Sequence, residues 1–193
     1  MGKLEGKTAV VTGGGTRGIG RATAARLAAE GAHVFITGRR KTELDEAVEA
    51  IEAGLRETAA GTSAGAGVTA VPGDITDPAD LDRLYDAVRA RGNGLDIVFA
   101  NAATASFATI EQLTVEDFDT VFGVNVKGTM LTVQKALPLL NAGASVIINA
   151  STTADRGTAA FGAYAASKAA LRSFARTWAN ELRHKGVRVN AIS

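Results

Sequence analysis

Cysteine is missing from this sequence of 193 residues, and so are a sizeable net charge and a long apolar run. Without cysteine the chain can form no disulfide, no zinc site built on thiolates and no thiol nucleophile. Its 21 Lys and Arg residues offset 20 Asp and Glu residues, and the net charge of +1 gives no electrostatic basis for binding nucleic acid. No stretch approaches the roughly 18 consecutive apolar residues of a membrane helix. We therefore expect a globular, cytoplasmic protein that binds neither nucleic acid nor membrane.

Short β-branched and apolar runs alternate with longer helical patterns along the chain. The predicted strands are residues 8–12, 33–37, 68–71, 95–100, 145–149 and 187–192. The predicted helices are residues 19–30, 42–53, 78–90, 114–137 and 163–184. Continuous apolar strands separated by such helices are typical of a parallel sheet covered on both faces. The sequence predicts a single α/β domain over residues 1–193, with a doubly wound, mostly parallel sheet of the Rossmann type.

Local signals agree with these boundaries. Thr114 is followed three residues later by Asp117, which resembles a capping box, and Asp77 precedes Pro78 as a predicted N-cap. The small residues of 61–67 show no periodicity, so they predict a surface connection inside the domain.

Glycine is abundant, with 22 residues, and a cluster of glycines separates the first predicted strand from the first predicted helix. A turn without Cβ atoms lets backbone N–H groups approach a pyrophosphate at the positive end of a helix. No Gly-Lys-Ser/Thr sequence closes the loop, which excludes a phosphate loop of the NTPase type. The loop predicts a dinucleotide site, and the alternative is a flexible glycine-rich loop. The predicted cofactor contacts in it are Gly13, Thr16, Arg17, Gly18, Ile19 and Gly20.

The Gly-x-x-x-Gly-x-Gly spacing resembles that of the short-chain dehydrogenase/reductase family, and further motifs of that family follow in order. Asp74 and Ile75, after the third predicted strand, match the family's adenine-contacting pair. Asn101 and Ala102, after the fourth, match its Asn-Ala-Gly segment, although Ala103 replaces the glycine. The resemblance implies that these four matching residues contact the cofactor.

The catalytic residues of the family also have counterparts. Asn125 lies in the following helix, Ser151 follows the fifth predicted strand, and Tyr164 and Lys168 form a Tyr-x-x-x-Lys signature. Tyrosine titrates near ~10, and a neighbouring lysine ammonium lowers that pKa toward the working range of an acid or base. The resemblance implies that Lys168 also holds the nicotinamide ribose, that Tyr164 contacts the cofactor, and that Asn125 positions a water for a proton relay. Ser151 would hydrogen-bond the substrate oxygen. The alternative is a structural helix pair and a serine that only caps a loop.

Other conspicuous side chains receive structural predictions. Tyr85 lies among apolar helix residues and is predicted to belong to the core. His33 and His184 pair with no acid at ligand spacing, so no metal site is predicted. Phe174 and Trp178 are predicted to pack into the core or an oligomer interface.

The end of the second predicted strand bears on the choice of cofactor. A carboxylate there would bind the adenosine 2′-hydroxyl of NAD, but the strand runs into Arg39 and Arg40 without an acid. Arg39 is placed to pair with a 2′-phosphate, and Arg17 could flank it. We therefore expect NADP(H), with NAD(H) as the alternative if the arginines are merely solvated.

The resemblance implies an oxidoreductase that interconverts a carbonyl and an alcohol by hydride transfer, with Tyr164 as acid and base. Residues expected near the substrate are small or apolar, which favours an uncharged ketone; they are Ala103, Phe107, Thr152, Thr153 and Phe161. The alternatives are a catalytically inactive dinucleotide-binding fragment or sensor, and an epimerase or dehydratase, which the glycine spacing disfavours.

Two further expectations follow from the resemblance. Family members continue past a segment like 187–193 into a Pro-Gly turn, a substrate lid and another strand, so we expect a fragment without the lid and the last strand. Helices like 114–137 and 163–184 pair across subunit interfaces in the family, so we expect a homodimer or homotetramer.

Overall fold

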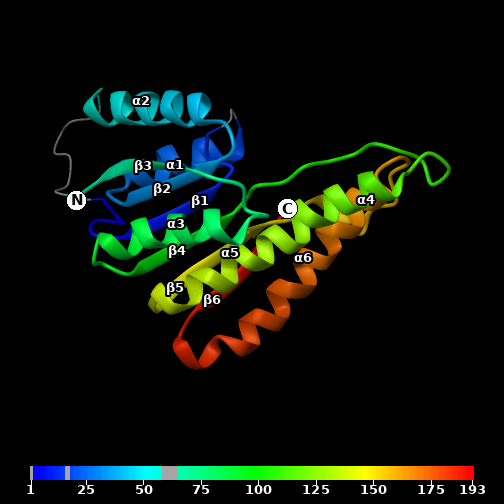
Figure 1. Ribbon diagram of the computed structural model, residues 1–193. Coiled ribbons are helices and arrows are strands. Elements are labelled where there is room, and N and C mark those ends of the chain that lie inside the picture. Colours follow the sequence, from blue (N-terminus) through cyan, green and yellow to red (C-terminus); the bar gives the residue numbers. More distant parts are fainter. Residues whose placement is uncertain (1, 16–17, 58–64) are drawn as a thin grey trace.

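A six-stranded parallel sheet lies at the centre of the computed structural model, which describes residues 2–15, 18–57 and 65–193 (Figure 1). Its strands are β1 (Thr8–Thr12), β2 (His33–Gly38), β3 (Gly67–Pro72), β4 (Leu95–Ala100), β5 (Leu140–Asn149) and β6 (Arg188–Ile192). They are arranged in the order β3-β2-β1-β4-β5-β6, and every pair of neighbours runs parallel. The predicted doubly wound α/β fold is confirmed.

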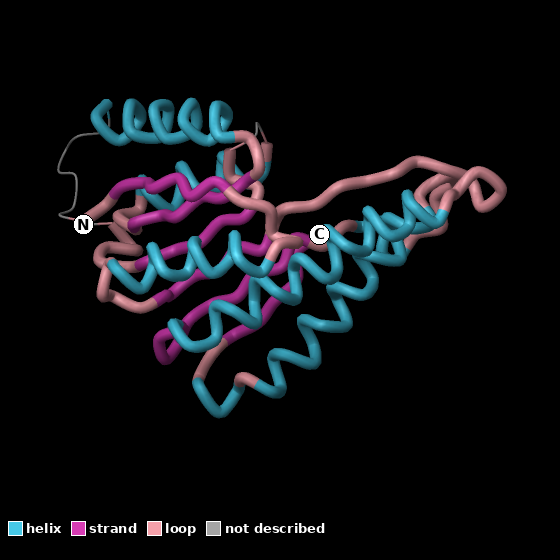
Figure 2. Tube along the Cα trace, viewed as in Figure 1, coloured by secondary structure: helices cyan, strands magenta, loops and turns pink. Residues whose placement is uncertain are grey.

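Helices cover both faces of the sheet (Figure 2). They are α1 (Ile19–Ala29), α2 (Lys41–Glu57), α3 (Pro78–Ala90), α4 (Val115–Phe122), α5 (Thr129–Ala136) and α6 (Gly162–Glu181). One apolar cluster joins the sheet to α1 and α2, and a second joins it to α3, α5 and α6. Among the helices that the structure describes, none combines the length and apolar character needed to cross a bilayer.

Burial on both faces of the sheet explains why the sequence of β1 has no exposed polar positions. All five of its residues are buried. Side chains alternate across a strand, so Ala9 and Val11 join the cluster under α1 and α2, whereas Val10 joins the cluster under α3, α5 and α6. A strand with helices on both faces needs apolar residues at every position.

The predicted helix starts are confirmed at two positions. The Thr114 hydroxyl accepts a hydrogen bond from the Asp117 N–H at 3.0 Å, and the Asp77 carboxylate accepts one from the Ala79 N–H at 2.8 Å. Each bond satisfies a backbone donor that the first turn of a helix leaves free. Of the predicted connection 61–67, residues 61–64 lie outside the described residues.

The helix predicted over residues 114–137 is confirmed, but it is not α-helical throughout. A π-helical segment, η1 (Gly123–Gly128), separates α4 from α5, and a short 3₁₀ turn, η2 (Leu137–Leu139), follows α5. Apolar periodicity does not distinguish a single widened turn from a regular helix. The second long helix, predicted over 163–184, is confirmed as α6 followed by the 3₁₀ turn η4 (Arg183–Lys185).

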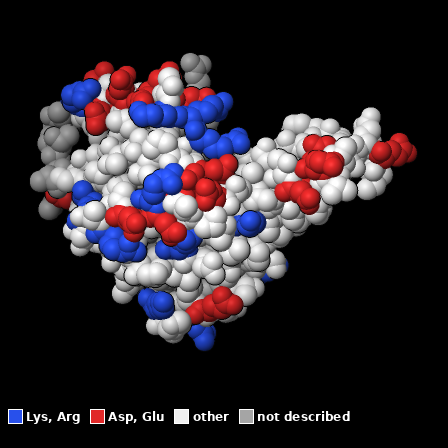
Figure 3. All heavy atoms as spheres, in the orientation of Figure 1, with Lys and Arg blue, Asp and Glu red and all other residues white. Residues whose placement is uncertain are grey.

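Beyond the carboxyl ends of the strands, α4, the segment 103–114 and the first half of α6 project as an arm (Figure 1). This arm carries exposed apolar side chains, namely Phe107, Ile110, Val115 and Phe118. Its visible outer part shows acidic and uncharged atoms but no Lys or Arg (Figure 3). In the sequence, residues 92–126 contain no Lys or Arg.

The two tyrosines provide a test of the core. Tyr85 is buried between α3 and α5, as predicted, and its hydroxyl donates to the Thr132 carbonyl at 2.7 Å. Burial raises the pKa of the Tyr85 hydroxyl. We expect Tyr85→Phe to lower the free energy of unfolding by about 1–2 kcal/mol, because it leaves a buried carbonyl lone pair without its donor.

Tyr164→Phe is the matched control, since Tyr164 is only half-buried and its hydroxyl forms no hydrogen bond among the described residues. Urea denaturation of both variants measures the difference. Equal losses of stability would show that the Tyr85–Thr132 bond contributes nothing.

Candidate active site

A crevice in a doubly wound sheet is expected where neighbouring strands send their connections in opposite directions. Strands β1 and β4 are such a pair, because β1 continues to β2 on one side and β4 continues to β5 on the other. Ligands of such folds bind at the carboxyl ends of these strands. The loop that follows β1 and the segment that follows β4 meet there.

The glycine loop is packed tightly at this point. Gly13 has a φ of +69°, and a Cβ there would lie 3.0 Å from Asn101 Nδ2. A Cβ on Gly20 would lie 2.3 Å from the Gly13 carbonyl oxygen. The described part of the loop is therefore a close-packed turn at the start of α1 that requires glycine. Thr16 and Arg17 lie outside the described residues.

Asn101 connects three strand ends. The Thr12 hydroxyl at the end of β1 accepts the backbone N–H groups of Asn101, at 2.9 Å, and Ala102, at 3.1 Å. The Asn101 amide donates to the Thr12 carbonyl at 2.9 Å, and its Oδ1 accepts from the Asn149 amide at 2.9 Å. The ends of β1, β4 and β5 are thereby fixed relative to one another. Thr12 and Asn149 were not among the site residues predicted from the sequence. Their position as polar residues at the ends of buried strands was the signal that could have identified them.

Lys168 is buried at the end of this network. Its side chain on α6 donates to the Asn149 carbonyl at 2.8 Å, and its Nζ lies 5.5 Å from the centre of the Tyr164 ring. Burial disfavours the charged ammonium and lowers the pKa of Lys168 to about 8. The expectation that Tyr164 and Lys168 share a helix face agrees with this geometry.

Asn125 lies in the π-helical turn η1 and is fully buried. Its Oδ1 accepts the Thr104 N–H at 2.8 Å, and its amide donates to the Thr104 carbonyl at 2.9 Å and to Ser167 Oγ at 3.0 Å. Ser167 in turn donates to the Tyr164 carbonyl at 2.6 Å. Asn125 therefore ties the segment after β4 to the helix that carries Tyr164. Single π-helical turns occur frequently at functional sites. Sequence reasoning missed Thr104 and Ser167.

Ser151 follows β5 and caps a 3₁₀ turn, η3 (Thr152–Asp155). Its Oγ accepts the Thr153 N–H at 3.2 Å and the Thr153 hydroxyl at 2.9 Å. In both contacts Ser151 is the acceptor, so its own O–H stays available as a donor. An ion pair between Asp155 and Arg172 fastens η3 to α6.

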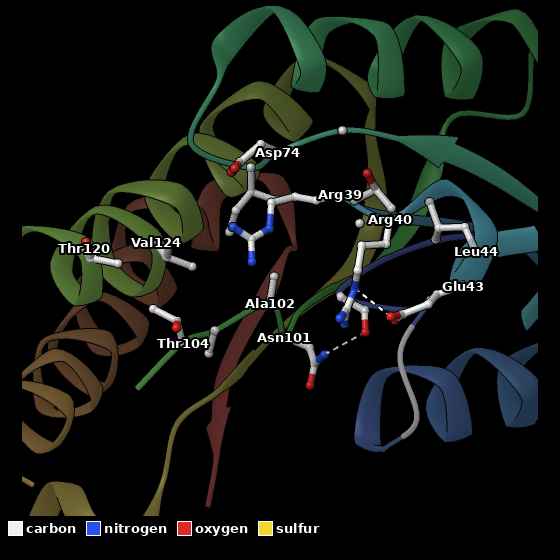
Figure 4. Close-up of a pocket in the computed structure, with 17 residues that line it drawn as sticks. Arg39, Arg40, Glu43, Leu44, Asp74, Asn101, Ala102, Thr104, Thr120 and Val124 are labelled. Atoms are coloured by element: carbon white, nitrogen blue, oxygen red, sulfur yellow. Dashed lines mark hydrogen bonds and ion pairs between the residues drawn. The ribbon is translucent and has the colours of Figure 1, made fainter. Parts of the chain in front are cut away.

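A cavity of about 290 Å³ opens beside the glycine loop (Figure 4). Six predicted cofactor residues line it: Gly13, Arg39, Asp74, Ile75, Asn101 and Ala102. Others on its lining were not predicted, including Thr37, Gly73, Thr104, Thr120 and Val124. The predicted residues Gly18, Ile19 and Gly20, and the predicted catalytic residues, do not line this cavity. Lys168 is connected to it through the Asn149–Asn101 hydrogen bond.

The two arginines after β2 differ in their surroundings. Arg40 Nε forms an ion pair with Glu43 Oε1 at 2.6 Å, whereas Arg39 forms no ion pair with the described residues and points into the cavity (Figure 4). Asp74 lies on the same lining, and its carboxylate accepts the N–H and the hydroxyl of Thr76 at 2.9 and 2.8 Å. A guanidinium without an ion pair among the described residues and a tightly packed glycine turn at the start of a helix can contact the phosphate groups of a nucleotide.

The buried lysine predicts a pH dependence of stability. An ordinary lysine titrates near 10.5, so between about pH 8 and that value the unfolded chain binds more protons than the folded one. We expect the free energy of unfolding to rise with pH through this window relative to Lys168→Met, which lacks the titrating group. Urea denaturation at several pH values between 7 and 11 measures it. Parallel profiles for the two proteins would contradict the lowered pKa.

Known proteins have similar sequences and folds. The sequence model of the family described as short chain dehydrogenase matches residues 7–193. An oxidoreductase of Sarocladium schorii is 46% identical over 193 residues, which are 99% of this chain and 72% of that protein. A hydroxynaphthalene reductase of Aspergillus fumigatus is 37% identical over 98% of this chain and 66% of its own length. The crystal structure of a short chain dehydrogenase from Burkholderia cenocepacia in complex with NADP superposes with a TM-score of 0.87 at 36% identity, covering 98% of this chain and 74% of that one. The chain belongs to the short-chain dehydrogenase family of oxidoreductases, whose members bind NAD(P) and act on small molecules.

Proposed function

We propose that this chain carries the cofactor site and the acid/base residues of an NADP(H)-dependent oxidoreductase that interconverts an uncharged ketone and an alcohol. The observation that carries the proposal is the buried ammonium of Lys168 beside the Tyr164 ring. A single hydrogen-bonded network joins it to the glycine loop. A module that only senses a nucleotide has no need of a buried lysine next to a tyrosine.

The residues divide the chemistry among themselves. The bound nicotinamide supplies the hydride when the ketone is reduced. Tyr164 donates the proton that the carbonyl oxygen takes up, and Lys168 favours the phenolate that is left behind. The free O–H of Ser151 orients the carbonyl and stabilises the charge that develops on its oxygen. In the reverse direction Tyr164 accepts the proton.

In this proposal Asn125 is a positioning residue that does not itself touch the substrate. Its side chain is engaged with Thr104 and Ser167, so it holds the segment after β4 and the start of α6 at a fixed separation. The proton relay through a water near Asn125 is part of the proposal.

The assignment of NADP(H) as cofactor rests on the residues that follow the end of β2. Gly38 is followed by two arginines and no carboxylate. Arg39 is the one that points into the cavity without an ion pair among the described residues. The neighbour from Burkholderia cenocepacia binds NADP, which agrees with this choice.

Self-association belongs to the same proposal. Val115 and Phe118 on α4 are exposed, and a groove of about 170 Å³ between α5 and α6 is lined in part by Met130 and Trp178. The stacked Phe174–Trp178 pair, with ring centres 4.6 Å apart, borders the same region. Exposed apolar side chains and grooves of this kind occur at protein interfaces. We infer a homodimer or homotetramer.

Replacing the acid/base tyrosine tests the mechanism. We expect Tyr164→Phe to reduce ketone-dependent NADPH oxidation by about 10²–10⁴-fold, because general acid catalysis is lost. The dissociation constant for NADPH, measured by calorimetry, should change little by comparison. Undiminished turnover would refute the role of Tyr164.

The arginine pair tests the cofactor assignment. We expect Arg39→Ala to weaken NADPH binding by about 10- to 100-fold, the loss expected for a charged hydrogen bond, and to leave NADH binding unchanged. Arg40→Ala is the control of equal charge, since Arg40 is already paired with Glu43. Equal effects of the two variants, or tighter binding of NADH than NADPH by the unmodified protein, would overturn the assignment.

A further inference from the structure

Tyr164 is the last of three aromatic rings in a row. The Phe161 ring lies edge-on to it, with centres 6.2 Å apart and an interplanar angle of 76°. The Phe107 ring lies 4.8 Å from the Phe161 ring at 54°. Phe161 directly precedes α6, whereas Phe107 belongs to the segment after β4. Two separate segments of the chain therefore contribute rings to a row that ends at Tyr164.

The backbone holds the two phenylalanines together. Ala108 and Phe161 form an isolated parallel bridge, and the Ala108 N–H donates to the Ala160 carbonyl at 3.0 Å. Ala160 has a φ of +63°, a left-handed conformation that is unfavourable for a residue with a Cβ. Such conformations persist where the surrounding structure enforces them, and they cluster at ligand sites. The Phe107–Phe161 contact is thus built into the fold before any ligand arrives.

Phe107 packs against the Phe161 ring but is otherwise open to solvent. Its side chain is 64% exposed, although it belongs to an ordered ring pair next to Tyr164. The acidic residues of the same arm, Glu111, Glu116, Asp117 and Asp119, repel carboxylates and phosphates. No Lys or Arg between residues 92 and 126 offsets them (Figure 3).

We propose that Phe107 and Phe161 form an aromatic wall that selects uncharged ketones bearing a flat aromatic ring for reduction at Tyr164. This inference rests on the proposed function and adds the substrate class to it. A flat ring can stack on, or meet edge-on, the exposed face of Phe107, while its carbonyl reaches toward Tyr164 and Ser151. A saturated ring of the same size buries similar area but lacks the ring quadrupole that aromatic pairs exploit.

The experiment compares two ketones with one carbon skeleton. 2-Tetralone has a flat aromatic ring, and 2-decalone is its saturated counterpart. We expect kcat/KM of the unmodified protein with NADPH to favour 2-tetralone by about 2- to 10-fold, as the range for one aromatic pair implies. Phe107→Leu should remove that preference, chiefly through KM. It should lower the free energy of unfolding only slightly, because the residue is mostly exposed and only its contact with the Phe161 ring is changed.

Phe118→Leu is the matched control. Phe118 lies on the same arm and stacks on another phenylalanine, Phe122, with centres 4.2 Å apart, but neither ring neighbours Tyr164. It should keep the preference of the unmodified protein. Loss of the preference in both variants would assign the effect to the arm as a whole and overturn the proposal.

Binding without turnover separates this inference from the proposed function. Ligand-observed NMR with 2-naphthol and with decahydro-2-naphthol reports recognition of the flat ring even if neither ketone is reduced. Preferential binding of 2-naphthol that Phe107→Leu abolishes supports the aromatic wall, and absent turnover would then contradict only the reductase activity. Reduction of both ketones with equal kcat/KM, or equal binding of both alcohols, would overturn the aromatic wall and leave the reductase proposal standing.

Discussion

The hydrogen bond between the Lys168 ammonium and the Asn149 carbonyl is the contact on which the arrangement of the site depends. A buried ammonium is costly to desolvate, and here the described structure gives it one carbonyl partner and the face of a tyrosine ring. That carbonyl belongs to a residue whose side chain is committed to Asn101, and Asn101 is committed to Thr12. The position of the charge is therefore set by the ends of three strands, which cannot shift singly.

The ammonium of Lys168 is connected both to Tyr164 on α6 and to the glycine loop after β1. Tyr164 lies one helical turn before Lys168 on α6, and the glycine loop lies at the other end of the amide network. The Asn125 side chain adds a second connection, from Thr104 to Ser167, and Ser167 bonds the Tyr164 carbonyl. Two networks thus reach the same helix from neighbouring strand ends. A helix held at two points keeps its side chains within the small tolerances that proton transfer requires.

The sequence predicted the residues whose identity is unusual and missed those whose role depends on geometry. The glycine spacing, Tyr164 and Lys168 stand out in a linear sequence because loops and helices rarely combine them in that order. Thr12, Thr104, Asn149 and Ser167 do not stand out, since Ser, Thr and Asn are common at strand ends and on helices. Their hydrogen bonds join residues up to about ninety positions apart, and only the strand order brings them together. The π-helical turn at Asn125 was unpredictable for a similar reason, because apolar periodicity over 114–137 fits a regular helix almost as well.

Arg39 and Arg40 also show that the sequence does not reveal which side-chain contacts form and that the structure does. They are adjacent, equally charged and both exposed, so the sequence alone gives a preference only by position. The start of α2 decides between them, because Glu43 lies three residues after Arg40 and takes up its charge. Arg39 points into the cavity, and Asp74 on the same lining accepts two hydrogen bonds from Thr76 through its Oδ1. The same helix start that neutralises one arginine therefore leaves the other without an ion pair among the described residues at this end of the crevice. The proposed anion site and the proposed acid/base pair therefore belong to different strand ends of one sheet, and we expect a substitution in either to leave the contacts of the other unchanged.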